Sequence, residues 1–420
     1  MRFTKLNDWL DWQSTLHLKS IDLGLERVSS VWKKLHPKKL SSFVITVAGT
    51  NGKGSSTAMF ESILIAAGFS VGCYTSPHLV RYNERHRING SEVDDHSLCQ
   101  AFSAIDDARG DISLSYFEFA TLASLYLFAQ EKLDVIVLEV GLGGRLDAVN
   151  IIDTDAALIT SIDLDHQDWL GSDRESIGFE KAGIFRANKP AFYAGQDIPL
   201  SIIEHAEKLG ANLKIADRDF HYIQHDNSWD FISDLGNRYA LPFPILRGQH
   251  QFENAAGVIA LLMDCRDSLA VSSEAIRHGL LTAQVQGRFQ VIQDKCTVII
   301  DVAHNEQAMK ALTSNLSNFH QNGRLHVIIG MLKDKDIQNT LKCLIPFVDR
   351  WHLVPTEGER GLSAEALKIE ILKLSSEAKT QIYDNVIESY HSVVKYTLNS
   401  DTILVTGSFL IAGTCLEILA

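Results

Sequence analysis

Short apolar runs alternate with segments of helical spacing in the first half of the chain. The run Phe43–Ala48 is followed by a helical pattern over 56–68 and by a second apolar run at 71–75. This order predicts β-α-β units and a parallel sheet. Apolar runs at 134–140 and 156–162 predict two further buried strands. Since ligands gather at the carboxyl ends of such strands, we expect the loops that follow these four strands to converge on one site.

The pattern changes twice in the second half. Over 217–241 aromatic residues alternate with polar ones between turn signals, which predicts antiparallel hairpins appended to the sheet. After 286–289 a second α/β rhythm begins, with strands expected at 297–301, 326–330, 351–354, 380–383 and 402–406 and a helix at 363–374. We therefore place a domain boundary near 287–292, which divides the chain into domains 1–288 and 289–420.

Composition narrows the class of protein. The chain has 420 residues, of which 45% are hydrophobic and 22% charged, enough for two packed domains. A formal net charge of -13 argues against a broad nucleic-acid footprint. The six cysteines have no zinc-like spacing and are expected to be reduced and mostly buried. Without an apolar leader or a membrane-length apolar run near the ~18 residues required, we expect a cytoplasmic location.

The stretch VAGTNGKGSSTAMF (47–60) joins an apolar strand to a helical segment through three glycines and a lysine. Backbone N–H groups and a helix N-terminus in such a turn favour phosphate, and Lys53 adds a positive charge. Ser55 or Ser56 could offer a hydroxyl to Mg²⁺. A glycine-rich turn built for packing alone is the alternative, but strand, helix and lysine together favour phosphate binding. Gly54 separates Lys53 from the serine, unlike the common form of this loop.

That departure is informative, because GTNGKGS resembles the loop of the Mur ligase superfamily and its folylpolyglutamate synthase branch. The resemblance continues in order along nearly the whole chain. It is carried by TSPHLVRYNER (75–85), LEVGLGGRLDAVN (138–150), DHQDWLG (165–171), EKAGIF (180–185), HQFENAA (250–256), GRFQ (287–290) and DVAHN (301–305). The implied fold is α/β: an N-terminal P-loop ATPase domain with a mostly parallel, doubly wound sheet and a small antiparallel appendage, then a smaller Rossmann-like domain.

The resemblance implies the site residues as well. It assigns ATP binding to Gly49, Thr50, Asn51, Gly52, Lys53, Gly54, Ser55, Asn254, Arg288 and Asp301. It implies a first Mg²⁺ held by Ser76, Glu139 and His166, and a second near a carbamylated Lys181. It gives catalytic roles to Lys53, Lys181, Arg288 and His304. A monovalent cation such as K⁺ belongs to the same expectation. The loop after DVAHN departs from the family, because Glu306 and Gln307 replace the usual Pro-His.

The segments IDLGLERV (21–28) and SYFEFATLAS (115–124) look like the pterin-binding segments of bacterial members with two activities. The residues expected to bind the pterin are Asp22, Leu23, Gly24, Leu25, Ser115, Tyr116, Phe117, Glu118, Leu146, Asp147 and Ala148. Without the resemblance, the leucines and phenylalanines would be read simply as core residues.

The implied activity is addition of L-glutamate to 7,8-dihydropteroate, and of further γ-linked glutamates to reduced folates, through an acyl phosphate. Three alternatives stay open: an enzyme with the second activity alone, another Mur-type amino-acid ligase, or a nucleotide-dependent switch. Only about forty residues precede the first strand, too few for the ~100-residue sugar-nucleotide domain of a peptidoglycan ligase. The expected partners are small molecules, with no nucleic acid and no membrane, and a monomer is the default.

Overall fold

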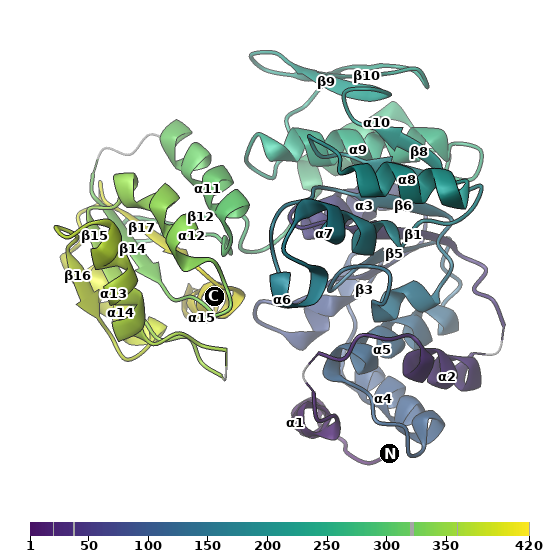
Figure 1. Ribbon diagram of the computed structural model, residues 1–420, viewed down its shortest axis with the longest axis horizontal. Helices are drawn as coiled ribbons and strands as arrows, with labels where there is room; N and C mark the ends of the chain where they lie inside the picture. Colours follow the sequence, from purple (N-terminus) through teal and green to yellow (C-terminus); the bar gives the residue numbers. More distant parts are fainter. Residues whose placement is uncertain (20, 37, 320–322, 359, 420) are drawn as a thin grey trace. The chain divides into compact units, whose positions relative to one another are not determined.

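The computed structural model describes residues 1–19, 21–36, 38–319, 323–358 and 360–419, which divide into two compact units (Figure 1). The first unit comprises Met1–His78, Tyr82–Ile245 and Gln251–Gln284. The second comprises Leu79–Arg81, Leu246–His250 and Val285–Ala420. Two short segments from earlier in the chain thus join the second unit, which no sequence pattern indicated. The predicted domain limits at 288 and 289 stay a prediction.

The first unit is built on an eight-stranded sheet of order β4-β3-β2-β5-β1-β6-β7-β8. Its strands are β1 Phe43–Ala48, β2 Val71–Tyr74, β3 His86–Ile88, β4 Ser91–Glu92, β5 Val135–Glu139, β6 Ala156–Ile159, β7 Pro190–Tyr193 and β8 Asn212–Ile215. The pairs from β2 to β8 are parallel, whereas β3 and β4 form an antiparallel edge beside β2. The four predicted strands are confirmed, and they are neighbours at the centre of the sheet.

Helices cover both faces of this sheet (Figure 1). They are α1 Leu6–Leu16, α2 Glu26–Leu35, α3 Lys53–Ala66, α4 Asp95–Arg109, α5 Tyr116–Gln130, α6 Gln167–Leu170, α7 Arg174–Ala182, α8 Leu200–Leu209, α9 His250–Asp264 and α10 Ser273–Thr282. Helix α5 begins with a capping box in which Ser115 and Glu118 each accept the other's backbone N–H. Helix α3 begins at Lys53, so the glycine-rich turn runs directly into it.

The hairpins predicted for 217–241 are present, but they form a sheet of their own rather than extra strands of the main sheet. Strands β9 Phe220–Gln224, β10 Trp229–Ser233 and β11 Arg238–Leu241 pair antiparallel in the order β11-β10-β9. Trp229 and Phe231 are fully buried, and Trp229 packs edge-on against Phe252 of α9. The aromatic positions of the alternating pattern therefore bury against a helix, which closes this small sheet off as a separate layer.

The second unit contains a six-stranded sheet of order β12-β13-β17-β14-β15-β16. Its strands are β12 Gln290–Gln293, β13 Thr297–Ile300, β14 Leu325–Ile329, β15 Arg350–Leu353, β16 Thr380–Ile382 and β17 Thr402–Thr406, and its helices α11 Glu306–Asn318, α12 Ile337–Leu344, α13 Ala364–Leu374, α14 Val386–Tyr396 and α15 Phe409–Leu419. All five predicted strands are confirmed; the antiparallel edge strand β12 was not predicted. Alternate strand residues such as Val298 and Ile299 enter separate apolar cores, so both faces of the sheet are covered.

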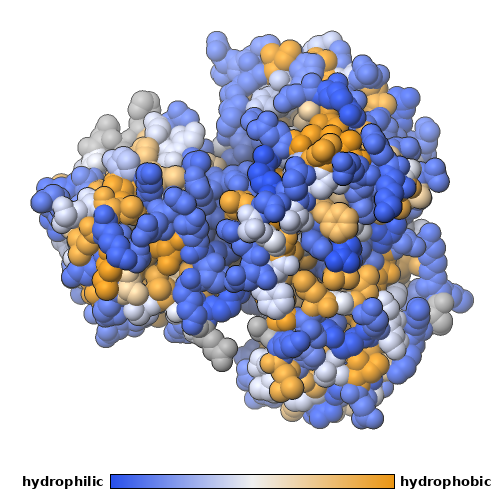
Figure 2. Space-filling view, viewed as in Figure 1, coloured by the Kyte–Doolittle hydropathy of each residue, from blue (hydrophilic) through white to orange (hydrophobic). Residues whose placement is uncertain are grey.

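The surface carries no extended apolar belt on the face drawn in Figure 2, where apolar side chains are scattered among hydrophilic ones. No helix in the described ranges is long and apolar enough to cross a membrane. All six cysteines are free thiols, and each is buried except Cys343, which is half-buried. The expectation of reduced, mostly buried cysteines is therefore confirmed.

Candidate active site

The glycine-rich turn after β1 needs its glycines for two distinct reasons. Gly49 and Gly52 have φ of +151° and +87°, values that L side chains rarely adopt. A Cβ on Gly49 would also collide with the hydroxyl of Thr160, and one on Gly52 with the amide oxygen of Asn254. The backbone thus approaches its neighbours too closely for any other residue. A turn of this shape leaves its N–H groups and the α3 N-terminus as the local source of positive potential.

The loop after β6 holds this turn in place. The Thr50 N–H donates to the Ser161 carbonyl at 2.7 Å, and the Thr160 hydroxyl donates to the Asn51 carbonyl at 2.6 Å. The Thr50 hydroxyl and the Asp163 backbone exchange two further hydrogen bonds of 3.0 Å each. The predicted convergence of loops is therefore confirmed for the two that follow β1 and β6.

Two lysines meet at the same turn. Lys53 donates from Nζ to the Gly49 carbonyl at 2.9 Å and to the Thr50 carbonyl at 3.1 Å. Lys181 of α7, which is buried, donates from Nζ to the Gly49 carbonyl at 3.0 Å. Burial lowers the pKa of Lys181 to about 7, and the charge of Lys53 acts in the same direction, whereas Asp165 and Asp147 oppose the shift. A large fraction of the Lys181 amine is therefore neutral near pH 7.

Glu139, the last residue of β5, lies beside the start of α3. A Cβ on Gly54 would lie 3.8 Å from each of its carboxylate oxygens, and the Ser76 N–H donates to the same carboxylate at 3.2 Å. Within the described ranges, no three His, Cys, Asp or Glu side chains gather into a group that could hold a metal ion. The single carboxylate of Glu139 nevertheless fits Mg²⁺. This ion keeps several waters and binds through one or two carboxylates together with substrate phosphates.

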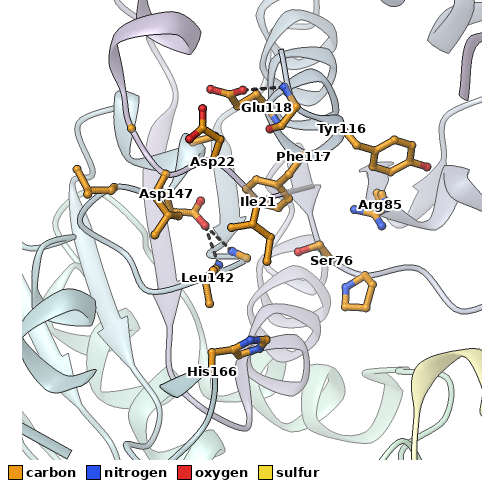
Figure 3. A pocket seen from close by; sticks show the side chains of 17 residues that line it. Ile21, Asp22, Ser76, Arg85, Tyr116, Phe117, Glu118, Leu142, Asp147 and His166 are labelled. Atoms are coloured by element: carbon orange, nitrogen blue, oxygen red, sulfur yellow. Dashed lines mark hydrogen bonds between the residues drawn. The ribbon is translucent and has the colours of Figure 1, made fainter. Parts of the chain in front are cut away.

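A cavity of about 270 Å³ opens next to Ser76 and reaches Asp22 and Glu118 (Figure 3). Every residue predicted to bind the pterin lines it except Leu25, which instead is the N-cap residue of α2. Ser76 and His166, predicted as metal ligands, line it too. The lining residues not predicted from the sequence are Ile21, Pro77, Arg85, Gly141 and Leu142. The binding roles of the predicted residues stay predictions.

Asp147 is a buried carboxylate on the cavity wall. Its Oδ2 accepts the N–H groups of Gly141 and Leu142 at 3.0 and 2.8 Å, and its Oδ1 accepts that of Val149 at 3.0 Å. Burial raises the pKa of Asp147 to about 6, although the three N–H donors oppose the shift. The carboxylate therefore fixes the loop after β5 in the shape that forms one side of the cavity.

Arg85 places a guanidinium group on the wall of the cavity, and this residue was not predicted from the sequence. Its Nε donates to Nδ1 of His78 at 2.7 Å, and its guanidinium lies 5.6 Å from the ring centroid of Tyr116. Burial and the neighbouring Arg85 lower the pKa of His78 to about 4, so the imidazole accepts this hydrogen bond as a neutral ring. Both residues belong to the motif TSPHLVRYNER, and this motif is the sequence signal that could have identified them as site residues.

The predicted residues of the second unit gather around the end of β13. Asp301 accepts the N–H groups of Phe289 and Ala303, each at 2.8 Å, and burial raises its pKa while Arg288 opposes the shift. Arg288 lies 5.7 Å from the ring centroid of Phe409, and Nδ1 of His304 is 2.8 Å from the Val302 carbonyl. Asn254 belongs to the first unit, where it lies beside Gly52.

Comparison with protein families assigns both units to one class of ligase. Residues 47–262 match the Mur ligase middle domain, and residues 287–409 match the Mur ligase glutamate ligase domain.

Individual relatives narrow the class. The chain is 46% identical over 414 residues to the dihydrofolate synthase/folylpolyglutamate synthase of Escherichia coli (strain K12), covering 99% of this chain and 95% of the relative. The Bacillus subtilis (strain 168) protein of the same name is 30% identical, with 97% of each covered. The structure of Escherichia coli FolC in complex with DHPP and ADP superposes with a TM-score of 0.93, at 47% identity, over 99% of this chain and 97% of that one. A bifunctional folylpolyglutamate synthase/dihydrofolate synthase with Mn, AMPPNP and L-glutamate bound gives 0.90 at 44% identity, over 99% and 98%.

The chain therefore belongs to the dihydrofolate synthase/folylpolyglutamate synthase family of Mur ligases.

Proposed function

We propose that this protein is an ATP-dependent ligase that joins L-glutamate to 7,8-dihydropteroate and adds further γ-linked glutamates to reduced folates. One observation carries the proposal: the phosphate turn and the cavity meet at Glu139. The carboxylate of Glu139 lies beside Gly54 of the turn and accepts the N–H of Ser76, which lines the cavity. A nucleotide tail in the turn and an acceptor in the cavity would therefore present their reacting groups to one another across Ser76.

The turn would bind the phosphates through its backbone N–H groups, and Lys53 would exchange its two carbonyl partners for phosphate oxygens. Ser76, Glu139 and His166 would hold a Mg²⁺ ion, and bound Mg²⁺ offsets the negative charge of the phosphates. An acceptor carboxylate oxygen attacks the terminal phosphorus, ADP leaves, and an acyl phosphate results. The neutral amine of glutamate then attacks the acyl carbon, and phosphate departs with one oxygen of the original carboxylate.

Lys181 fits a carbamate because carbamate formation requires a neutral amine in a shielded position. Its amine is buried, has a pKa of about 7 and lies at the phosphate turn. Reaction with CO₂ would replace a cation by an anion there, and the carbamate oxygens are hard ligands suited to a second Mg²⁺. A monovalent cation such as K⁺ is part of the same proposal.

For the second unit we propose ATP binding by Arg288 and Asp301, and catalytic roles for Arg288 and His304. Both carboxylate oxygens of Asp301 accept backbone N–H groups. We therefore propose that Asp301 fixes the shape of the ATP-binding loop and takes no direct part in catalysis. The relative solved with L-glutamate bound supports glutamate as the amine substrate. We further propose a cytoplasmic monomer whose partners are small molecules rather than nucleic acid.

The test is a two-acceptor assay. The protein is incubated with ATP, Mg²⁺ and L-glutamate, and ADP is measured without acceptor, with dihydropteroate and with tetrahydrofolate. We expect ADP with either acceptor and none without. Response to tetrahydrofolate alone would replace the bifunctional assignment by folylpolyglutamate synthesis. ADP release that ignores both acceptors would favour a nucleotide-dependent switch and overturn the proposal.

A further inference from the structure

The cavity is closed on one side by the segment 21–24, which we call the strap. Ile21, Asp22, Leu23 and Gly24 all line the cavity, yet the strap belongs to no helix or strand. On one flank the Gly24 N–H donates to the Leu146 carbonyl at 3.3 Å, in the loop after β5. A segment without secondary structure is held in place by contacts of this kind. The contacts on the other flank of the strap therefore also determine the shape of the cavity.

Arg27, in the first turn of α2, fixes that other flank. Its Nη1 lies 2.6 Å from Oδ2 of Asp22, and its Nη2 donates to the Asp22 carbonyl at 3.1 Å. The same Nη2 donates to Oε1 of Glu118 in α5, also at 3.1 Å. The guanidinium thus joins the strap to the helix whose first turn supplies Tyr116 and Phe117 to the cavity. Arg27 itself does not belong to the residues described as lining it.

The burial of the three partners shows that this contact is more than a surface ion pair. The side chain of Glu118 is only 4% exposed, and those of Asp22 and Arg27 are 22% and 29% exposed. The Glu118 carboxylate also accepts the Ser115 N–H at 2.8 Å as part of the capping box of α5. Burial would raise the pKa of Asp22, but Arg27 and the neighbouring His17 and Lys19 outweigh it and keep the pKa below its usual range. Without Arg27, Asp22 would keep His17, whose Nε2 lies 3.1 Å from its Oδ2, but would lose its link to Glu118 of α5.

We infer that Arg27 is a positioning residue that sets the affinity for the acceptor by locking the strap onto the N-terminus of α5. The inference rests on the proposed function, because the acceptor is the molecule assigned to this cavity. A planar guanidinium can bind two carboxylates and a carbonyl at once, which a lysine ammonium cannot reproduce in the same geometry. We assign the nucleotide to the turn 49–55, a different part of the unit, so its affinity should not depend on Arg27.

Lys19 provides a matched control on the same carboxylate. Its Nζ lies 3.6 Å from Oδ1 of Asp22 and its side chain is 71% exposed, so it contributes charge near the strap without a link to α5. Lys19→Ala therefore removes one positive charge and leaves the lock in place. Arg27→Ala removes the same charge together with the lock.

The experiment measures kcat and the KM for dihydropteroate and for ATP in the wild type, Arg27→Ala, Arg27→Lys and Lys19→Ala. We expect Arg27→Ala to raise the acceptor KM by about tenfold, the loss of one well-placed ion pair, with kcat and the KM for ATP within about twofold of wild type. The acceptor KM of Arg27→Lys should lie between those of the wild type and Arg27→Ala. Lys19→Ala should change the acceptor KM by less than about twofold. KM does not scale with the amount of folded enzyme, so partial unfolding of a variant does not mimic this result.

A double-mutant cycle tests whether Arg27 acts through the strap. If it does, combining Arg27→Ala with Asp22→Ala raises the acceptor KM by less than the product of the two single effects, because both substitutions remove the same ion pair. Independent, multiplying effects would overturn the inference. So would an acceptor KM in Arg27→Ala equal to that of Lys19→Ala, or a fall in kcat at unchanged KM. A wild-type protein without acceptor-dependent ADP formation would instead defeat the proposed function before any variant is compared.

Discussion

The phosphate turn and the cavity beside it are built in opposite ways, although Glu139 and Ser76 connect them. The turn is one continuous stretch of sequence whose shape is fixed by glycines with positive φ, and its proposed ligand groups are backbone N–H groups. The cavity is assembled from strap, loop and helix segments that lie between Ile21 and His166, and its walls are mostly side chains. Chemistry that depends on the backbone is therefore local, whereas recognition of the acceptor depends on tertiary packing.

This difference teaches where substitutions should act. In the turn, Lys53 is proposed to contact the phosphate that reacts, so its loss should reduce turnover. In the cavity, each wall residue is proposed to contribute a share of the acceptor's binding energy, so its loss should raise KM and leave turnover nearly unchanged. The predictions below test this division, from the largest expected effect to the smallest.

Lys53→Ala should reduce kcat by about 10³-fold or more, because it removes the positive charge assigned to the terminal phosphate. The fold should persist, since Nζ of Lys53 donates to two carbonyls of its own turn rather than to a distant element of the core. ADP formation and circular dichroism are measured side by side. Lys189→Ala, which breaks an ion pair with Asp155 elsewhere in the unit, is the control and should keep its activity. Wild-type turnover in Lys53→Ala would contradict the assignment of the turn.

Glu139→Ala should raise the Mg²⁺ concentration needed for half-maximal activity by about tenfold or more, since a hard oxygen ligand is lost. Activity is titrated with Mg²⁺ at saturating ATP and acceptor. Glu139→Asp keeps the carboxylate on a shorter side chain and should give an intermediate shift. If the Mg²⁺ titration were unchanged in both variants, the metal would bind elsewhere. Glu139 would then not connect the turn to the cavity through a metal ion.

The carbamate on Lys181 should form more readily as the pH rises from 6 to 8. The pKa of Lys181 is lowered to about 7, so the amine is mostly protonated at pH 6 and mostly neutral at pH 8. An ordinary lysine, with a pKa near 10.4, would stay protonated throughout this range. Mass spectrometry under CO₂ should detect an adduct of about 44 Da on Lys181 that grows with pH. An adduct that is absent at pH 8, or of equal extent on exposed lysines, would refute the prediction.

Phe117→Leu should have the smallest effect, a rise of about fivefold in the acceptor KM, because it removes one aromatic contact worth about 1 kcal/mol. Phe117 lines the cavity, and its ring fills the space that a Cβ on Gly141 would occupy. Phe119 is fully buried two residues further along α5 and supplies the control. Phe119→Leu should lower the melting temperature without changing KM, and the opposite pattern would contradict the division proposed above.

The contrast between turn and cavity also explains what the sequence could predict. The turn and the central strands β1, β2, β5 and β6 were predictable because glycine spacing and apolar runs are local signals. Arg85 and Arg27 were not singled out, because an arginine in a motif does not reveal which distant carboxylate or ring it will meet. Leu25 does not line the cavity, for a similar reason. It follows Gly24 in sequence, but there the chain turns into α2 and away from the cavity lining.

The limits of the second unit show a related restriction. The rhythm of strands after 289 predicted its sheet, but Leu79–Arg81 and Leu246–His250 join that unit across long sequence separations. Such contacts depend on tertiary packing, which periodicity does not record. The antiparallel strand β12 was not predicted for a different reason. It is a short edge strand beside β13, and three of its four residues are only half-buried, so its apolar pattern is weak.

The transfer of an acceptor oxygen to phosphate is the central event of the proposed reaction, and isotope labelling tests it most directly. Dihydropteroate labelled with ¹⁸O in its carboxylate is incubated with the protein, ATP, Mg²⁺ and L-glutamate, and the released phosphate is examined by mass spectrometry. The account predicts that each phosphate carries one ¹⁸O atom from the acceptor. Phosphate released at the same rate without the label would show that the carboxylate is never phosphorylated, and would contradict the account.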